Sequence, residues 1–171
     1  MNDLLVAIPD RSTQEFLTAH LQGAPFEILP KEKWFAPIFA SKTELPPEIV
    51  KAEVTYYGSF LSASLWYDAM LGYTNLVLVF QSDEMNRRHL ELLNTGFPPK
   101  IPSETYSPHI TLVYGMPPIT RTNKSFINSL PLAMKPKYDF RFVFDTEVLL
   151  ESNGYVPNLE GQKYFTDAFF D

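Results

Sequence analysis

The feature that most constrains this 171-residue chain is the stretch Tyr106–Gly115, which predicts one short β-strand. Pro108 favours extended geometry in the residue before it, the run that follows is apolar and partly β-branched, and a glycine ends it. Residues two apart in a strand share a face, so His109 and Thr111 point the same way, with Val113 beyond them. The intervening side chains are expected on the opposite face, packed against helices: Ile110, Leu112 and Tyr114.

A histidine beside a threonine suits phosphodiester chemistry. A neutral imidazole can move a proton near pH 7, and a threonine hydroxyl can donate a hydrogen bond to a phosphate oxygen. The stretch Tyr106–Leu112 resembles the second His-x-Thr motif of the 2H phosphoesterase superfamily, which includes the bacterial ligT-type RNA 2′,5′ ligases and cyclic phosphodiesterases. Within that superfamily it is most similar to phage enzymes that degrade the cyclic oligonucleotide signals of bacterial CBASS defence. The alternative is a buried strand that carries His109 and Thr111 for structural reasons.

The first His-x-Thr motif of that superfamily is missing. It should lie in the proline-rich segment 25–47, where the histidine position falls on Phe35 or Ala36 and the threonine position on Pro37 or Ile38. In the Ala36 register, an engineered His→Ala substitution would leave this sequence. In the Phe35 register, both groups have been lost naturally. The sequence is compatible with both registers.

The missing motif bears directly on catalysis. The resemblance implies two histidines on opposite sides of the phosphorus, one acting as general base and the other as general acid. Losing one proton carrier lowers the rate by roughly 10²–10⁴, which shifts such a protein towards binding. Three lysines flank the vacant motif and could hold phosphate as point charges or lie on a solvated loop: Lys31, Lys33 and Lys42.

Composition narrows the partners. Lys and Arg number 14 against 20 Asp and Glu, and the net charge of −6 argues against binding long nucleic acid through its phosphates. There is no cysteine, and the three histidines at 20, 89 and 109 have no ligand spacing, so no metal and no cofactor are expected. No signal peptide or long apolar run is present. We therefore expect a cytoplasmic protein without membrane contact, in the host bacterial cytoplasm if it is phage-encoded.

The remaining elements follow from periodicity and capping signals. Strands are expected at 4–8 and 138–151, and a hairpin or three-stranded meander over 51–80 with its turn at 66–73. A helix should begin with a capping box at Ser12–Glu15, a second should run from Ser82 to Gly96, and a short one should lie around 126–130. His89 falls in the apolar stripe of the second helix and is expected in the core, facing away from His109.

The long strand at 138–151 alternates without interruption, and it is similar to the strand that follows the second motif in ligT-type proteins. Its polar face carries Arg141 and Glu147, which are either contacts for a base or phosphate or solvated charges on an exposed edge. Other candidate substrate contacts lie near the two motifs: Trp34, Phe35, Lys42 and Tyr106.

Together these signals predict an α+β fold. The resemblance implies two pseudo-symmetric lobes of antiparallel strands around a central cleft, with helices outside. We expect one domain over 1–171, in which 152–171 is an aromatic extension that docks on its own domain or on a second copy, as in a homodimer. Two functions remain open. One is a metal-independent 2H-type phosphodiesterase for small cyclic nucleotides or oligonucleotides, impaired by its missing motif. The other is an inactive 2H-fold module that sequesters a nucleotide or inhibits a host protein partner.

Overall fold

The computed structural model describes residues 1–68, 72–101, 103–134, 141–152 and 162–165. The α+β class is confirmed. The helices and strands are, in chain order: β1 (Leu4–Pro9), α1 (Arg11–Leu21), β2 (Ala36–Ala40), β3 (Tyr56–Asp68), β4 (Tyr73–Gln81), α2 (Asp83–Thr95), β5 (His109–Val113), α3 (Arg121–Met134), β6 (Phe142–Leu150) and β7 (Gln162–Phe165). Three short 3-10 turns, Lys31–Lys33, Pro47–Ile49 and Ser103–Thr105, lie in the connections.

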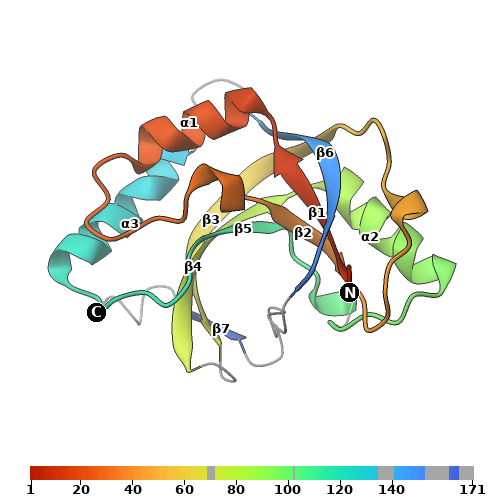
Figure 1. Ribbon diagram of the computed structural model, residues 1–171. Helices are drawn as coiled ribbons and strands as arrows, with labels where there is room; N and C mark the ends of the chain where they lie inside the picture. Colours follow the sequence, from red (N-terminus) through yellow and green to blue (C-terminus); the bar gives the residue numbers. More distant parts are fainter. Residues whose placement is uncertain (69–71, 102, 135–140, 153–161, 166–171) are drawn as a thin grey trace.

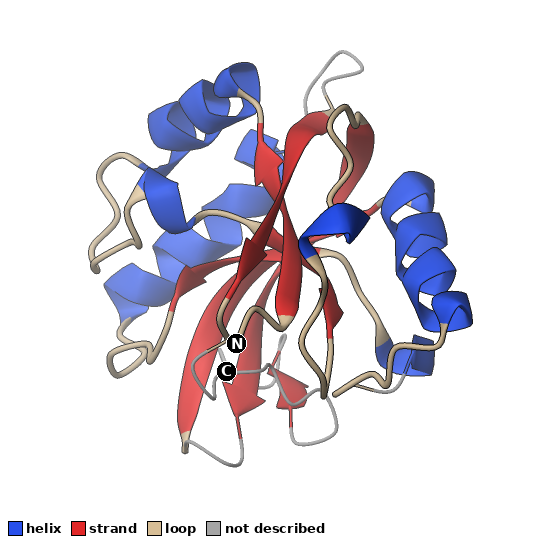
Figure 2. Cartoon of the chain, turned by 45° about the vertical axis from the view of Figure 1, so that its right-hand side comes forward, coloured by secondary structure: helices blue, strands red, loops and turns tan. Residues whose placement is uncertain are grey.

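The strands form one antiparallel sheet rather than two separate lobes. Its order is β2-β1-β6-β3-β4-β5, and β7 pairs with β3 off this path. The sheet is continuous because β3 is 13 residues long: its first three residues pair with β6, and residues from Ser59 onward pair with β4. In Figure 1 the strands arch over a concave side with the helices outside the arch, and Figure 2 shows the strands running between helices on both sides.

The two ends of the sheet are built in the same way. At one end, α1 connects β1 to its antiparallel neighbour β2; at the other, α2 connects β4 to its antiparallel neighbour β5. We call β1, β2 and β6 the first half of the sheet, and β3, β4 and β5 the second half. This repeated strand, helix, strand unit places β2 and β5 at opposite ends of the strand order.

The main hydrophobic core lies between the sheet and the three helices. It contains Leu17 of α1, Met85 of α2 and Ile127 of α3 together with inward residues of every strand from β1 to β6. The opposite face, which we call the inner face, carries two small separate clusters. One is Leu4, Val6 and Ala40 in the first half, and the other is Trp66, Val77 and Val79 in the second half. The inner face is therefore the surface on which side chains outside the main core gather.

Register shifts bend the sheet and change which face its residues occupy. On β6, Phe144 pairs with Pro9 and Thr146 pairs with Ile8, so Asp145 is an extra residue. Beyond it the alternation is reversed: Phe144 lies in the main core, whereas Val148 packs against the inner cluster of the first half. The uninterrupted alternation expected along this strand is therefore wrong.

A second register shift affects β5, the strand that carries His109 and Thr111. On β5, Thr111 pairs with Val77 and Val113 pairs with Leu76, so Leu112 has no partner of its own. Val113 is consequently turned into the main core with Ile110 and Leu112, and it does not continue the face of His109 and Thr111 as the alternation predicts.

The caps predicted for the second helix are confirmed, whereas the N-cap predicted for the first helix is wrong. The second helix begins at the predicted N-cap Ser82 and ends at Gly96, which has φ 104°. The first helix, however, is capped by Asp10, whose Oδ1 accepts from the Thr13 amide at 2.8 Å, so the capping box predicted at Ser12 is wrong. Asp10 is the N-cap because it is the extended residue between β1 and the first helical residue.

Three further predictions concern the region 51–80, the third helix and the C-terminal extension. The region 51–80 contains one hairpin, β3 and β4, and Trp66 belongs to β3 rather than to the turn. The third helix is 14 residues long, not short. Most of the predicted extension 152–171 and residues 138–140 of the predicted long strand lie outside the described residues. Within the described part of the chain, no helix is both long and apolar enough to cross a membrane.

One close approach holds the two halves together. Gly58 lies where β3 passes from β6 to β4, and a Cβ atom there would come within 2.6 Å of Cδ2 of Phe80. The Phe80 ring in turn stacks on Phe144 of β6, with ring centroids 5.1 Å apart. Only glycine leaves room for this aromatic contact between a strand of one half and a strand of the other.

Candidate functional site

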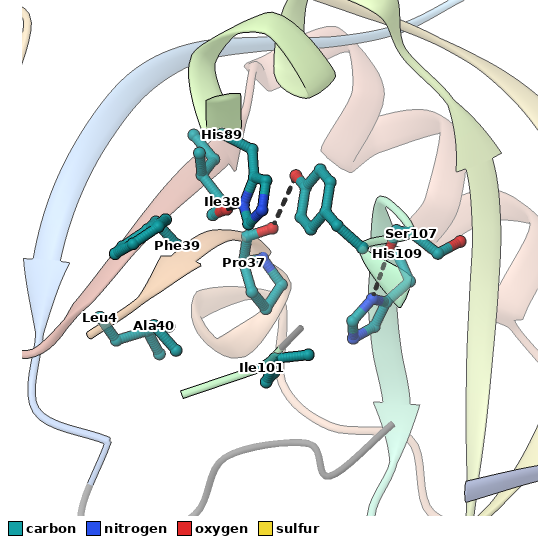
Figure 3. A pocket seen from close by; sticks show the side chains of 10 residues that line it. Leu4, Pro37, Ile38, Phe39, Ala40, His89, Ile101, Ser107 and His109 are labelled. Carbon is teal, nitrogen blue, oxygen red and sulfur yellow. Dashed lines mark hydrogen bonds between the residues drawn. The ribbon is translucent and has the colours of Figure 1, made fainter. Parts of the chain in front are cut away.

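Two adjoining hollows lie where the inner faces of β2 and β5 meet, and they share Leu4 and Pro37. The His109 hollow, about 30 Å³, is shown in Figure 3 and is lined by Leu4, Pro37, Ile38, Phe39, Ala40, His89, Ile101, Tyr106, Ser107 and His109. The Thr111 hollow, about 80 Å³, is lined by Leu4, Lys33, Phe35, Pro37, Thr111, Tyr114, Leu150, Glu151 and Ser152. Curvature of the sheet therefore brings its two end strands to one place.

His109 is the buried imidazole of this site. Its side chain is almost fully enclosed, and its ring centroid lies 4.6 Å from that of Trp66. Its Nδ1 lies 2.8 Å from the Ser107 carbonyl oxygen, and because a carbonyl only accepts, Nδ1 must carry the proton. The Nε2 atom of the neutral ring then keeps its lone pair. Burial lowers the pKa of His109 to about 4, so the ring is neutral at pH 7.

Thr111 lies two residues further along β5, in the adjoining hollow. Its side chain is buried, and Tyr114 lines the same hollow. Burial raises the pKa of Tyr114, and the neighbouring Thr111 hydroxyl partly opposes that rise. The exposed side chain of Lys33 adds a positive charge to this hollow. A hydroxyl donor and an ammonium group are both suited to an anionic phosphate oxygen.

The facing wall, on and beside β2, carries Lys33 but no imidazole and no threonine. Phe35 and Pro37 line the Thr111 hollow opposite Thr111, and Pro37 also faces the His109 hollow. The two residues between and after them do not line the Thr111 hollow: Ala36 is 0% exposed and Ile38 is 1% exposed, and both belong to the main core, although Ile38 also borders the His109 hollow. Neither phenylalanine nor proline has a side chain that can carry a proton.

Tyr106 and His89 fix the edge of β2 against β5. The Tyr106 hydroxyl donates to the Pro37 carbonyl oxygen at 3.1 Å. The His89 ring stacks on the Tyr106 ring with centroids 4.2 Å apart and an interplanar angle of 2°, and its Nδ1 lies 2.7 Å from the Ile38 carbonyl oxygen. These contacts hold the two walls of the site at a fixed separation.

A comparison with protein families identifies the chain. The family model for the anti-CBASS protein Acb1 matches residues 12–147. The chain belongs to the anti-CBASS protein Acb1 family. This is a family of phage counter-defence proteins against CBASS cyclic-nucleotide signalling. Among curated proteins, no match is found.

The Acb1 family match contains both walls of the site. His109 and Thr111 lie within it, and so do Phe35 and Pro37, whereas Leu4 and Ser152 at the rim lie outside it. Family membership implies a partner in CBASS signalling. Among the described residues, no group of three or more His, Cys, Asp and Glu side chains could hold a metal ion.

Three of the predicted substrate contacts lie elsewhere in the structure. Trp34 is buried in the main core, where its indole N–H donates to the Leu29 carbonyl at 2.8 Å. Lys42 is exposed, and Arg141 is exposed with its guanidinium 5.7 Å from the centroid of the Tyr57 ring. None of the three is among the residues that line the two hollows.

Glu147 has a different role from the predicted one of a base or phosphate contact. Because the extra residue on β6 reverses the alternation, its carboxylate is buried and bound by Arg88, the Tyr56 hydroxyl and the Lys51 amide. Burial alone raises the pKa of Glu147, but the hydrogen bonds from Arg88, Tyr56 and Lys51 outweigh it and hold the pKa below its usual value. This buried ion pair links β6 to α2 and satisfies the carboxylate within the protein.

Two residues of the site were missed by the sequence analysis. His89 is buried as expected, but it lines the same hollow as His109 instead of facing away from it. Tyr114 lines the Thr111 hollow, although strict alternation placed it on the other face. No local signal marks the register shift at Leu112 that turns Tyr114 towards the site. The stacking of His89 on Tyr106 likewise depends on how α2 packs.

Proposed function

We propose that this protein binds a small cyclic nucleotide or oligonucleotide of CBASS signalling through the His109–Thr111 wall and retains it, with catalysis impaired by the missing first motif. The observation that carries this proposal is the composition of the two facing walls. One has an imidazole and a hydroxyl, and the other has Phe35 and Pro37, with the ammonium of Lys33 beside them.

The proposal treats the chain as a metal-independent 2H-type domain. The repeated strand, helix, strand unit at the two ends of the sheet supports this view, because it sets β2 and β5 in equivalent positions. It also favours the Phe35 register for the missing motif, since Phe35 and Pro37 line the same hollow as Thr111, whereas Ala36 and Ile38 do not. In that register both functional groups were lost naturally.

Binding and catalysis place different demands on this site. A bound phosphodiester can accept hydrogen bonds from Thr111 and attract Lys33, and its negative charge would raise the depressed pKa of His109. Cleavage in the 2H mechanism needs a second proton carrier across the phosphorus. Without it, one of the two proton transfers has no partner, which lowers the rate by roughly 10²–10⁴.

A second candidate function is slow hydrolysis by His109 alone. The observation that favours it is the tautomer of His109, because Nδ1 donates to Ser107 and Nε2 retains its lone pair. Such a ring can accept the proton of an attacking water while a solvent molecule protonates the leaving oxygen.

One experiment separates these functions. The protein and its His109→Ala variant are incubated in EDTA with 2′,3′-cyclic nucleotides, 2′,5′ oligoadenylates, and cyclic di- and trinucleotides, followed by filtration and mass spectrometry of both fractions. We expect intact ligand retained with the protein in a near-stoichiometric amount. Product that accumulates over many turnovers and disappears with His109→Ala would establish the enzyme instead. Neither retention nor product across the panel would overturn both functions.

A further inference from the structure

A third, much larger hollow adjoins the site. It is open, has a volume of about 580 Å³, and is lined by Pro25, Phe26, Glu27, Ile28, Leu29, Pro30, Val113, Tyr114, Gly115 and Pro117. We call it the Tyr114 groove. Small-molecule sites usually measure about 300–1,000 Å³, a range that includes this groove and excludes the His109 and Thr111 hollows. Those two hollows have room for a phosphate group but not for a whole nucleotide.

Tyr114 connects the groove to the site, because it lines both the groove and the Thr111 hollow. It borders that hollow together with Thr111, yet the residue is 37% exposed. One part of the tyrosine therefore contacts the phosphate-sized hollow while the rest of it is open to solvent. A ligand with its phosphate at Thr111 would meet this ring next.

Both walls of the groove are held in place by hydrogen bonds. On one side, the Leu29 amide donates to the Leu112 carbonyl at 2.8 Å, which ties the proline-bounded segment 25–30 to β5. On the other, Gly115 has φ 69°, a conformation that suits glycine, and its amide donates to Oδ1 of Asn75 at 3.0 Å. The groove is thus formed before any ligand binds, which lowers the entropic cost of binding.

We propose that the Tyr114 groove is the nucleobase subsite of this protein, in which a base stacks on Tyr114 while the adjoining phosphate lies at Thr111 and Lys33. This inference rests on the proposed function and names the part of the ligand that the two small hollows cannot hold. Aromatic side chains accept any base by stacking, because every base has a π-face. The groove offers aromatic and aliphatic side chains to the face of a base, and the Glu27 carboxylate and backbone groups to its polar edge.

The first test measures how much the base contributes to affinity. Dissociation constants are determined for a cyclic dinucleotide and for ribose 2′,3′-cyclic phosphate, which has no base, with the protein and its Tyr114 variants. We expect Tyr114→Ala to weaken the cyclic dinucleotide about tenfold or more and to change the base-free probe much less. Tyr114→Phe, which keeps the ring, should stay within about threefold of the parent. Tyr57→Ala, which removes a 42% exposed tyrosine on β3, is the matched control and should have no effect.

The second test locates the base without relying on a variant. A cyclic dinucleotide carrying an azido-purine is photo-crosslinked to the unmodified protein, and the adducts are mapped by peptide mass spectrometry. Adducts within residues 25–30 or 113–117 are expected. Saturable binding with adducts only elsewhere, or an equal loss for both probes in Tyr114→Ala, overturns the subsite but leaves the proposed function intact. If no cyclic nucleotide binds the parent protein at all, the proposed function itself fails.

Discussion

The two halves of the inner face share an architecture and differ in chemistry. In the first half, four apolar residues line the Thr111 hollow, with Lys33, Glu151 and Ser152 at their sides: Leu4, Phe35, Pro37 and Leu150. In the second half, the corresponding surface carries His109 and Thr111 beside Trp66. Each half contains a strand, a helix and an antiparallel strand, so the same framework carries the His109–Thr111 wall and the β2 wall, which has neither group. The framework therefore does not depend on the groups that would perform catalysis.

The strongest test of this difference is to introduce the histidine and threonine of the missing first motif into the β2 wall. The double variant Phe35→His/Pro37→Thr should raise the cleavage rate of a cyclic nucleotide about 10²-fold or more, since it supplies the second proton carrier. The measurement is product formation by mass spectrometry in EDTA.

The matched control for this gain is Ala36→His/Ile38→Thr, which puts the same two residues into the main core. It should show no gain and should unfold at a lower temperature, because polar groups would be buried there without partners. Equal gains from both double variants would mean that orientation on β2 does not decide the chemistry.

The next largest effect concerns the buried ion pair beneath the first half. Arg88→Met should lower the free energy of unfolding by about 3–5 kcal/mol, because it leaves the Glu147 carboxylate buried without its main partner. Denaturant unfolding followed by circular dichroism measures this change. Arg88→Met/Glu147→Leu should recover much of the lost stability, and a double variant as unstable as the single one would contradict the explanation.

The His109–Thr111 wall should make the free energy of unfolding depend on pH, whereas Phe35 and Pro37 on the β2 wall do not titrate. The pKa of His109 is about 4 in the folded protein, against a usual value of 6.5. Between these values the unfolded chain binds more protons, so the free energy of unfolding falls as the pH drops from 6.5 to 4, by up to about 3 kcal/mol. Above pH 6.5 the imidazole is neutral in both the folded and the unfolded chain, so His109 no longer lowers the free energy of unfolding.

Urea titrations at several pH values test this dependence. His109→Leu should show a correspondingly flatter fall between pH 6.5 and 4, while His89 remains in both proteins and cancels in the comparison. Parallel pH profiles for the parent and the variant would show that His109 is not held neutral by its surroundings.

The smallest effect compares the caps of helix α1. Asp10→Ala should lower the free energy of unfolding by about 1 kcal/mol, because the Thr13 amide loses its acceptor. Ser12→Ala changes an exposed residue inside the helix and should have almost no effect. Thermal unfolding of the two variants distinguishes them, and a larger loss for Ser12→Ala would restore the capping box.

Local signals predicted the elements well. Helix α2 begins and ends at its predicted caps, and β5 is the short strand that Pro108 and Gly115 indicate. Each of these predictions depends on interactions within a few residues of chain, and such interactions are visible in a sequence.

The faces of the strands were predicted less well, for a physical reason. Alternation holds only while each residue has one partner on the next strand, and a single extra residue reverses it. The reversal at Asp145 moved Glu147 from the expected site to the ion pair with Arg88. The reversal at Leu112 moved Tyr114 to the site. Both shifts depend on how the neighbouring strand pairs, and one strand's sequence does not contain that information.

Gly58 is a position at which this fold does not accept another residue. Any other residue there would collide with Phe80, whose ring meets Phe144 across the boundary between the halves. At Phe35 and Pro37, by contrast, the side chains line the Thr111 hollow, and no glycine-like restriction applies. The requirement for a close backbone approach and the chemistry of the site therefore lie at different positions of the chain.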